Sequence, residues 1–449
     1  MSVLWIKKPL AVFTANQENA DNGIVIRDGI IIELLAKDQQ PQLAIDQKFD
    51  ASDHILLPGL VNTHHHLYQT LTRAFPAALN KRLFPWLKTL YPIWAKLQPD
   101  MLHAASELGL AELMLSGCTT VADHHYLFPQ ALTEAIDIQV SAANKIGNRV
   151  LLTRGSMSLG QDHGGLPPQS TVQTDEAILD DCQRVIKQFH QPAAGAMVQL
   201  ALAPCSPFSV TTELMKETAK LARDYGVRLH THLAETEDEN NFCLQAFGLR
   251  PLDYLESVNW LAEDVWLAHG IHFNDEEVKR LGKAKMGIAH CPSSNMILAS
   301  GMCRTMELQT AGVHIGLGVD GSASNDGSNM IQEVRQALLM NRLRYQADEV
   351  THQDALYWAT KGAAQVLGRD DIGELAIGKQ ADIALFNLDE PRFSGSHDPL
   401  AALILCGAHS ADYVMVAGQW KVKQGKLAMG DMDEIQFRHR ASALSLVIQ

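Results

Sequence analysis

Histidines and carboxylates recur in this chain at the ends of short apolar runs, a pattern that suits binding of a metal ion. The stretch VNTHHHLYQT, residues 61–70, holds three consecutive histidines, although the chain has only 19 in 449 residues. Side chains alternate between the two faces of a strand, so His64 and His66 point to one side and His65 to the other. Two imidazoles on one face at a strand end form half of a typical metal site. A core or hydrogen-bonded role is the alternative for each histidine taken alone.

Two later runs supply the rest of a ligand set. The run VRLHTHLAE puts His230 and His232 on one face, with Glu235 three residues beyond His232. We expect His232 to be the third nitrogen ligand, His230 to lie one layer deeper, and Glu235 to be a proton shuttle rather than a solvated loop carboxylate. The run GLGVDGSASND places Asp320 after an apolar stretch, where a carboxylate can bind the ion and hydrogen-bond its water. We expect Asp326 to be a loop or helix-start residue.

Three histidines, one aspartate and an open position describe a catalytic metal site rather than a structural one. Such an ion lowers the pKa of its water towards neutrality and generates a hydroxide nucleophile. A second ion would need a bridging group, normally a modified lysine after the fourth run, and residues 188–215 contain no lysine. We therefore expect one divalent ion, Zn²⁺ with Fe²⁺ as the alternative. This leaves His269 free to polarise the electrophile or stabilise a developing alkoxide.

The elements that must position these residues are eight short apolar runs, each ending in polar or small residues. Helical stretches such as 101–116 and 212–226 lie between most of them. Eight strand–helix units predict an α/β fold of the (β/α)8 TIM-barrel type, with its active site at the carboxyl ends of the strands. An open doubly wound sheet is the alternative, but no G-x-G-x-x-G follows the first run. The runs are ILLPGLVNTHHH, TTVADHH, RVLLTRGS, MVQLALAPCS, VRLHTHLAE, VWLAHG, KMGIAHCPSS and HIGLGVDGS.

The two ends of the chain read as short strands. GIVIRDGIIIEL is a β-hairpin signal, with Asp28-Gly29 between two Ile/Val runs, and residues 371–424 have the same character. We therefore expect two domains. Residues 1–57 and 370–449 form a small composite β-sandwich with a C-terminal tail, and residues 58–369 form the catalytic barrel.

Composition and charge limit the kinds of binding partner and the cellular compartment that we expect. A net charge of −14 repels phosphate backbones, so a nucleic-acid polymer is not expected as a partner. The seven cysteines are scattered without a C-x-x-C motif, which favours free thiols in a reducing cytoplasm. The N-terminus lacks the features of a signal peptide, and no apolar run approaches 18 residues, so we expect no membrane association.

Five motifs occur in the order and spacing of the amidohydrolase superfamily: PGLVNTHHH, HTHLAE, LAHG, AHCPSSN and GVDGSASND. The chain resembles the branch of guanine-, cytosine- and adenosine-type aminohydrolases over nearly its whole length. GELAIGKQADIALFNL resembles the segment that returns after the barrel to complete the sandwich. The resemblance implies a distorted barrel, a homo-oligomer, and a metal held by four residues: His64, His66, His232 and Asp320.

The same resemblance implies roles in a hydrolytic deamination. Glu235 would take a proton from the metal-bound water and hand it to the ring nitrogen beside the attacked carbon. Asp320 would deliver the second proton to the departing amine, and His269 would stabilise the tetrahedral adduct. Ammonia leaves and a carbonyl remains, so general acid–base and metal catalysis act around one carbon.

Closer features indicate the substrate. HHHLYQTLTRAFP, LFPWLKTLYPIW, ADHHYLFP, RGSMSLGQDHGGLPPQS and APCSPFSVT resemble bacterial 8-oxoguanine deaminases, a group that also accepts guanine and isocytosine. We expect Gln69 to pair with an amide-like purine edge, Trp86 and Tyr126 to stack on a flat ring, and Cys205 to face the pocket. A surface amide, rim packing by the tryptophan and barrel filling by the cysteine are the alternatives. We expect the Gly- and Pro-rich loop 155–170 to form a wall or lid.

Other functions compete with this one. An s-triazine (hydroxyatrazine-type) hydrolase or a pterin aminohydrolase would use the same chemistry on another flat ring. A non-catalytic scaffold is disfavoured, because all four metal positions and both proton carriers are present. Polymer-editing deaminases need H-x-E with P-C-x-x-C, and here Pro204-Cys205 is followed by Ser206-Pro207-Phe208.

Overall fold

A closed barrel of eight parallel strands forms the centre of the molecule in the computed structural model, which describes residues 2–448. Each strand pairs with the next one along the chain. The barrel closes where the Thr63 amide and hydroxyl both donate to the Leu317 carbonyl oxygen, at 2.9 Å each. The predicted (β/α)8 barrel is confirmed, and all eight apolar runs contribute its strands. These are β7 (Leu60–Asn62), β8 (Cys118–His125), β9 (Arg149–Ser156), β10 (Val198–Pro204), β11 (Arg228–Leu233), β12 (Val265–His269), β13 (Gly287–His290) and β14 (His314–Leu317).

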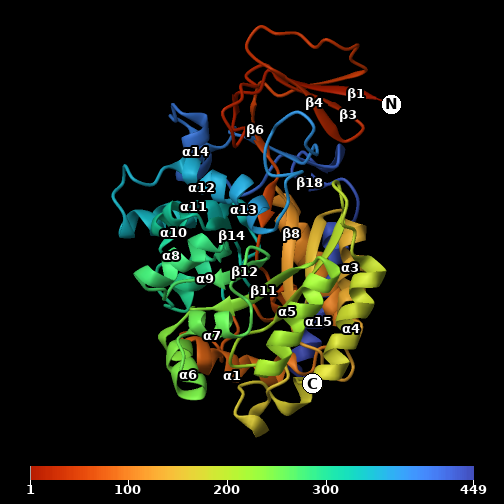
Figure 1. Ribbon diagram of the computed structural model, residues 1–449. Helices are drawn as coiled ribbons and strands as arrows, with labels where there is room; N and C mark the ends of the chain where they lie inside the picture. The colour runs from red at the N-terminus through yellow and green to blue at the C-terminus, as the bar shows by residue number, and fades with distance from the viewer. Residues whose placement is uncertain (1, 449) are drawn as a thin grey trace.

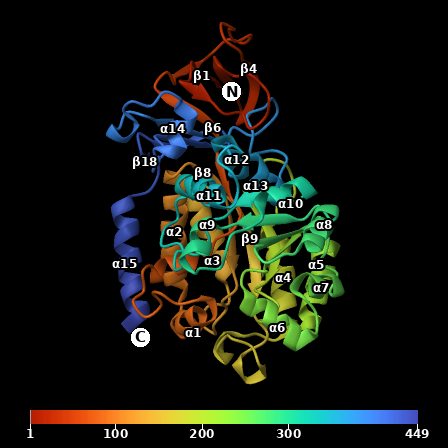
Figure 2. The ribbon, with the colours of Figure 1, turned by 90° about the vertical axis from the view of Figure 1, so that its left-hand side faces the viewer.

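Helices surround this barrel on its outer side (Figures 1 and 2). Their ends follow from local sequence: the Thr174, Thr211 and Asn274 side chains accept hydrogen bonds from backbone amides in the first turns of α4, α5 and α8. Gly147 and Gly226 end α3 and α5 in left-handed conformations with φ of 94° and 66°. The helices are α2 (Pro99–Leu115), α3 (Ala135–Ile146), α4 (Asp175–Phe189), α5 (Thr212–Tyr225), α6 (Glu237–Phe247), α7 (Pro251–Ser257), α8 (Asp275–Lys283), α10 (Thr305–Ala311), α11 (Met330–Arg344), α12 (His352–Trp358) and α13 (Lys361–Val366).

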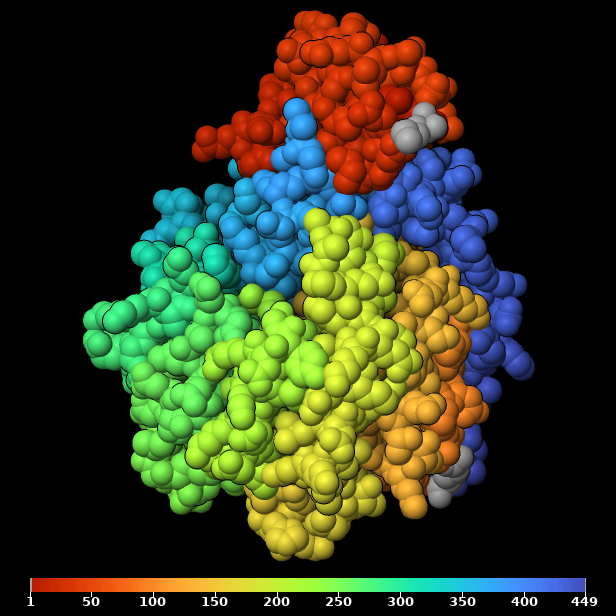
Figure 3. Space-filling view, turned by 45° about the vertical axis from the view of Figure 1, so that its right-hand side comes forward, coloured from red at the N-terminus to blue at the C-terminus, as the bar shows by residue number. Residues whose placement is uncertain are grey.

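Segments from both chain ends, coloured red and blue, lie together above the barrel in Figure 3, and their strands form a second lobe. Asp28 and Gly29 both have positive φ, of 54° and 78°, as a two-residue hairpin turn requires. Ile6 and Ile24 of one sheet share a buried core with Leu56 and Ile383 of the other. The first sheet contains β1 (Val3–Lys7), β3 (Gly23–Arg27), β4 (Ile30–Leu35) and β5 (Gln47–Asp50). The second contains β2 (Ala11–Val12), β6 (His54–Pro58), β15 (Ile383–Asn387), β16 (Tyr413–Val416), β17 (Gln419–Lys423) and β18 (Lys426–Leu427).

The end of the chain returns to the barrel as α15 (Met432–Ile448), which lies alongside α2 in Figure 2. Its Arg438 pairs with the buried Glu107 carboxylate of α2 at 2.6 Å. Its His439 bonds to the Thr70 hydroxyl at 3.1 Å, within the turn that follows the triple histidine. Within residues 2–448, none of the helices has the length and apolar character needed to cross a membrane.

A buried ion pair joins the lobe to the barrel. Arg149, at the start of β9, donates to the Asp382 carboxylate through Nε at 2.6 Å and Nη2 at 3.2 Å. Its Nη1 donates to the Gly195 carbonyl oxygen at 2.6 Å, and Asp382 also accepts from the Ala417 amide at 2.7 Å. The side chains of Arg149 and Asp382 are 0% and 2% exposed. Removing one partner therefore leaves an uncompensated charge inside the protein.

We predict that Arg149→Met lowers the free energy of unfolding by about 3–5 kcal/mol, because Asp382 is then buried without its counter-charge. Chemical unfolding followed by tryptophan fluorescence measures the change. Arg223→Met is the matched control: Arg223 pairs with Asp264 at 2.9 Å near the surface, and its loss is expected to cost about 0–1 kcal/mol. Equal losses in the two variants would contradict the role given to the buried pair.

Candidate active site

The carboxyl ends of β7, β11 and β14 bring four candidate ligands to one point. His66 Nε2 lies 3.2 Å from His232 Nε2. Asp320 Oδ1 lies 3.3 Å from Nε2 of His64 and 3.3 Å from Nε2 of His66. His64, His66 and His232 form a group whose ligand atoms all lie within 4.8 Å of one another. His65 turns the other way and bonds through Nε2 to the Ser328 hydroxyl at 2.9 Å.

Backbone carbonyl groups fix which nitrogen of each imidazole carries the proton. His66 Nδ1 lies 2.7 Å from the His124 carbonyl oxygen, and His232 Nδ1 lies 2.7 Å from that of Cys205. Because a carbonyl oxygen can only accept, both Nδ1 atoms are protonated and both Nε2 atoms present lone pairs. This is the arrangement that orients metal-binding histidines in proteins.

His230, one layer deeper in the barrel, fixes the position of the ring proton of His64. Its Nδ1 donates to the Trp266 carbonyl oxygen at 2.9 Å, so its Nε2 accepts from His64 Nδ1 at 2.8 Å. The His230 ring stacks on the Trp266 indole, with centroids 4.3 Å apart and an angle of 12° between the planes. His64 Nε2 is left as a buried atom with no hydrogen-bond partner among the described residues.

These donors fit a divalent cation. Burial lowers the pKa of His64 and His66 and brings that of His232 to about 3, so the three rings are neutral. Lone pairs that face one another at 3.2 Å without a proton repel, and a cation among them removes that repulsion. Two donors about 2.1 Å from one tetrahedral ion lie about 3.4 Å apart, close to the spacings seen here.

A second group of histidines nearby is less suited to a metal. His64, His124 and His230 also bring ligand atoms together. However, both ring nitrogens of His230 are engaged, by Trp266 and by His64, and His124 Nε2 bonds to the Ala203 carbonyl oxygen at 3.0 Å. The sequence interpretation assigned His124 no role, and its alternation within TTVADHH is the signal that could have placed it in the barrel interior.

Glu235 and His269 stand beside the ligand cluster. Glu235 Oε2 lies 3.5 Å from His269 Nε2, and that nitrogen lies 3.9 Å from Asp320 Oδ2. His269 Nδ1 donates to Asn295 Oδ1 at 3.0 Å, which turns Nε2 towards the cluster. Burial raises the pKa of Glu235. Burial opposes protonation of His269, but Glu235 and Asp320 together raise its pKa. Both shifts favour the protonated form relative to an exposed side chain.

Three of the segments that carry these groups leave their strands through strained backbone. Ala234, His269 and Asp320 have φ of 54°, 71° and 61°, in the left-handed region that side chains other than glycine disfavour. His269 and Asp320 face the cluster themselves, and Ala234 directly precedes Glu235, which also faces it. Strain of this kind concentrates at functional sites, where it aims side chains that regular strand geometry would direct elsewhere.

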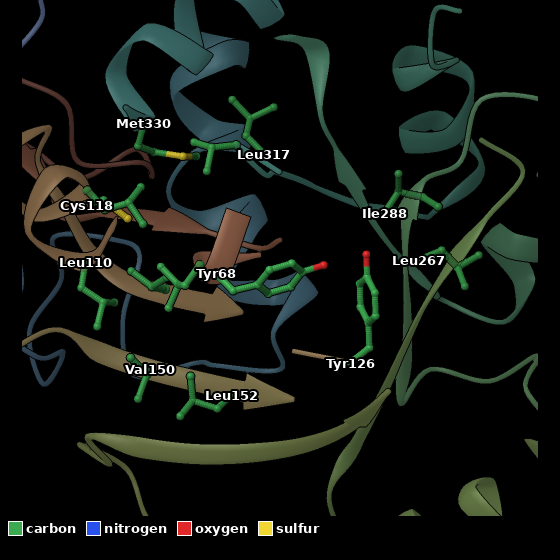
Figure 4. Close-up of a cluster of buried hydrophobic side chains, with 14 of the residues drawn as sticks. Tyr68, Leu110, Cys118, Tyr126, Val150, Leu152, Leu267, Ile288, Leu317 and Met330 are labelled. Carbon is green, nitrogen blue, oxygen red and sulfur yellow. The ribbon is translucent and has the colours of Figure 1, made fainter. Parts of the chain in front are cut away.

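A cavity opens against this cluster, and its lining includes His66, His232, Glu235, His269 and Asp320. All four residues predicted to bind substrate line it: Gln69, Trp86, Tyr126 and Cys205. Figure 4 shows Tyr126 and Tyr68 among the buried side chains, with their hydroxyl groups directed towards the same interior space. The structure therefore brings the predicted substrate-binding, proton-transfer and metal-binding residues together.

Gln69 lines the cavity and has an unpaired hydrogen-bond acceptor. It lies in the turn η1 (Leu67–Thr72), and its Nε2 donates to the Tyr68 hydroxyl at 3.4 Å. Its Oε1 is buried without a hydrogen-bond partner among the described residues. This oxygen lies so close over Gly321 that a Cβ there would be 1.9 Å away, so the glycine beside Asp320 makes room for the amide.

The helix α1 (Leu83–Trp94) supplies a wall that the sequence interpretation largely missed. Besides Trp86, it contributes Leu83, Leu87 and Tyr91 to the cavity lining. Trp86 lines the cavity and also donates from Nε1 to the Ala323 carbonyl oxygen at 3.3 Å, and its stacking on a substrate ring stays a prediction. The apolar spacing in LFPWLKTLYPIW predicts the buried face of this helix, but not that it covers the barrel mouth.

The loop 155–170 does not form the expected wall, and a role as a lid stays a prediction. Among the described residues, none from this loop lines the cavity. Instead, the amides of Ser158 and Leu159 donate to the Ser209 carbonyl oxygen at 3.0 Å each, so the loop lies behind the wall formed by Ser206 and Phe208. Asp326 is a loop residue, as expected, and accepts from the Ala74 amide at 2.5 Å.

Comparisons with known proteins agree with this geometry. The model of the amidohydrolase family matches residues 55–421. An 8-oxoguanine deaminase from Pseudomonas aeruginosa is 62% identical over 447 residues, covering 100% of each chain. An isoxanthopterin deaminase from an unknown prokaryotic organism is 35% identical, over 86% of this chain and 84% of its own. The crystal structure of atrazine chlorohydrolase TrzN from Arthrobacter aurescens TC1 complexed with zinc superimposes with a TM-score of 0.91 at 32% identity, over 99% of this chain and 100% of its own.

We predict that His230→Phe weakens zinc binding about 10- to 100-fold, because the ring still stacks on Trp266 but no longer accepts from His64 Nδ1. Competition with a chromophoric chelator measures the dissociation constant. His290→Phe provides the control, since His290 is a buried strand-end histidine that bonds to Asn341 at 3.3 Å. An undiminished affinity in His230→Phe, or an equal loss in both variants, would exclude the orienting role.

Proposed function

The chain belongs to the amidohydrolase family, and on that basis we propose that it is a metal-dependent deaminase of free 8-oxoguanine that releases ammonia. The observation that carries this proposal is the 62% identity, over the full length of both chains, to an 8-oxoguanine deaminase. Guanine and isocytosine are proposed as further substrates. Both contain the same N–C(NH2)=N unit, and a carbonyl group follows one of its ring nitrogens.

The contents of the cavity support a flat, amide-containing substrate. The free Gln69 Oε1 can accept from a ring N–H, which satisfies an otherwise unpaired buried atom. The aromatic rings of Trp86 and Tyr126 are available for contact with a planar heterocycle. Cys205 adds a small, weakly polar group at the end of β10.

The chain's own residues can carry the protons of the reaction. When bound, the divalent ion activates a water for attack on the amino-bearing carbon. Glu235 accepts a proton from that water and delivers it to the adjacent ring nitrogen. Asp320 carries the second proton to the departing amine. His269, oriented by its hydrogen bond to Asn295, would stabilise the negative charge that develops on the attacked centre.

We propose zinc as the ion, because a structural relative is complexed with zinc and the ligand set suits it. Ferrous iron is the alternative for three histidines and one aspartate. The absence of lysine from residues 188–215 supports a single ion. The free cysteines support the cytoplasm as the compartment, and a homo-oligomer remains our prediction from the family resemblance.

Triazine and pterin hydrolysis are second candidates, and the relatives favour them less. The isoxanthopterin deaminase and the atrazine chlorohydrolase are 35% and 32% identical to this chain, against 62% for the 8-oxoguanine deaminase. A non-catalytic scaffold would not need to keep a cluster of buried donors oriented towards one point.

We expect the zinc-loaded protein to release ammonia from 8-oxoguanine with the highest kcat/KM in a panel of free purines, pterins and hydroxytriazines. The higher identity to an 8-oxoguanine deaminase than to the pterin and triazine relatives predicts this order. Ammonia release is measured for each compound. Turnover of a triazine or pterin without turnover of 8-oxoguanine or guanine would refute the proposed substrate while leaving the hydrolase chemistry in place.

Glu235→Gln should retain the metal and lose about 100- to 10,000-fold in kcat, because an amide cannot shuttle a proton. Metal content and steady-state ammonia release are measured on the same sample. Glu237→Gln is the matched control, since Glu237 lies two residues away and pairs with His272 at 2.9 Å in an exposed position. Full activity in Glu235→Gln would disprove the shuttle.

A further inference from the structure

Tyr91 is a buried tyrosine of α1 whose hydroxyl group has no hydrogen-bond partner among the described residues. The residue is 1% exposed and lines the cavity. A buried hydroxyl group without a partner destabilises a protein. Such a group facing a cavity is therefore expected to be satisfied by whatever occupies the cavity.

Several other polar groups near α1 and in the cavity lining are already engaged. Trp94 Nε1 donates to the Thr72 hydroxyl at 3.1 Å, and Trp86 Nε1 donates to the Ala323 carbonyl oxygen at 3.3 Å. Of the serines in the lining, Ser206 bonds to Ser209 at 2.7 Å and Ser324 bonds to Asp320 at 3.3 Å. The Tyr91 hydroxyl differs from these groups because it makes no hydrogen bond of full geometry among the described residues, and its polar neighbours are the Cys205 thiol and the Tyr126 hydroxyl.

Packing holds the Tyr91 ring in place and keeps its hydroxyl protonated. The ring makes an edge contact with Trp94, with centroids 5.9 Å apart at 74°. Burial raises the pKa of the hydroxyl well above its usual value, and the nearby Cys205 and Tyr68 add to the shift. The group therefore acts as a neutral donor at physiological pH, suited to a carbonyl oxygen rather than to a cation.

Tyr91 and Gln69 line the cavity from different elements, α1 and η1. Gln69 lies over Gly321, next to the ligand Asp320, and so serves the six-membered ring whose amino-bearing carbon reacts. Tyr91 comes from α1, in the wall that also contains Leu83 and Leu87. A purine whose reacting carbon lies at the metal extends its five-membered ring away from the metal, towards such a wall.

We propose that Tyr91 is a specificity-determining residue that donates a hydrogen bond to the carbonyl oxygen on the five-membered ring of an oxidised purine. This inference rests on the proposed function and adds to it. Guanine carries C–H where 8-oxoguanine carries this carbonyl, and isocytosine lacks the five-membered ring altogether. A donor at this position therefore favours 8-oxoguanine over both.

The test compares Tyr91→Phe with the unaltered zinc-loaded enzyme on 8-oxoguanine, guanine and isocytosine. We expect kcat/KM for 8-oxoguanine to fall about 10- to 100-fold, the range for leaving a buried carbonyl group unpaired. The values for guanine and isocytosine should stay within about threefold, since neither substrate offers the acceptor. Isocytosine is the internal control for folding, metal loading and chemistry.

Tyr254→Phe is the matched variant, because Tyr254 is equally buried and its hydroxyl bonds to Thr212 at 3.4 Å, between α7 and α5. It should leave all three values unchanged. An equal loss on all three substrates in Tyr91→Phe, or no loss on 8-oxoguanine, would overturn the proposal for Tyr91 alone. Failure of the unaltered enzyme to deaminate 8-oxoguanine would overturn the proposed function first.

Discussion

Mutual repulsion among buried lone pairs is the constraint on which the rest of this structure depends. Three neutral imidazoles and one carboxylate converge at the carboxyl end of the barrel, with donor atoms 3.2–3.3 Å apart. Carbonyl groups of His124 and Cys205, together with His230, hold the ring protons on the far sides. Burying such a set without a cation is costly, so the ligand cluster and its supporting hydrogen bonds make sense together only as a metal site.

The barrel positions the site residues, and the lobe is attached at the opposite end of the barrel. Strand pairing brings distant segments to one end, while the ion pair of Arg149 and Asp382 fixes the lobe at the other. Left-handed backbone at Ala234, His269 and Asp320 then turns the reactive groups inward. The stabilising ion pair thus lies away from the mouth of the barrel, where Glu235 and Gln69 line the cavity.

The features that depend on local periodicity could be predicted from the sequence. The eight strands, the Asp28-Gly29 hairpin and the opposite directions of His65 and its two neighbours follow from alternation and turn chemistry. The features that are determined by long-range packing could not be predicted in this way. Two examples are α1, which covers the mouth of the barrel, and the loop 155–170, which lies behind the wall of the cavity. Their positions depend on contacts between segments that are far apart in the sequence, and local sequence patterns do not reveal such contacts.

The most direct test of the account is diffraction from crystals grown with zinc, recorded on both sides of the zinc absorption edge. The account predicts one anomalous peak per chain, about 2.0–2.2 Å from Nε2 of His64, His66 and His232 and from the carboxylate of Asp320. A peak between His64, His124 and His230, or a pair of peaks bridged near the end of β10, would contradict the single-ion site.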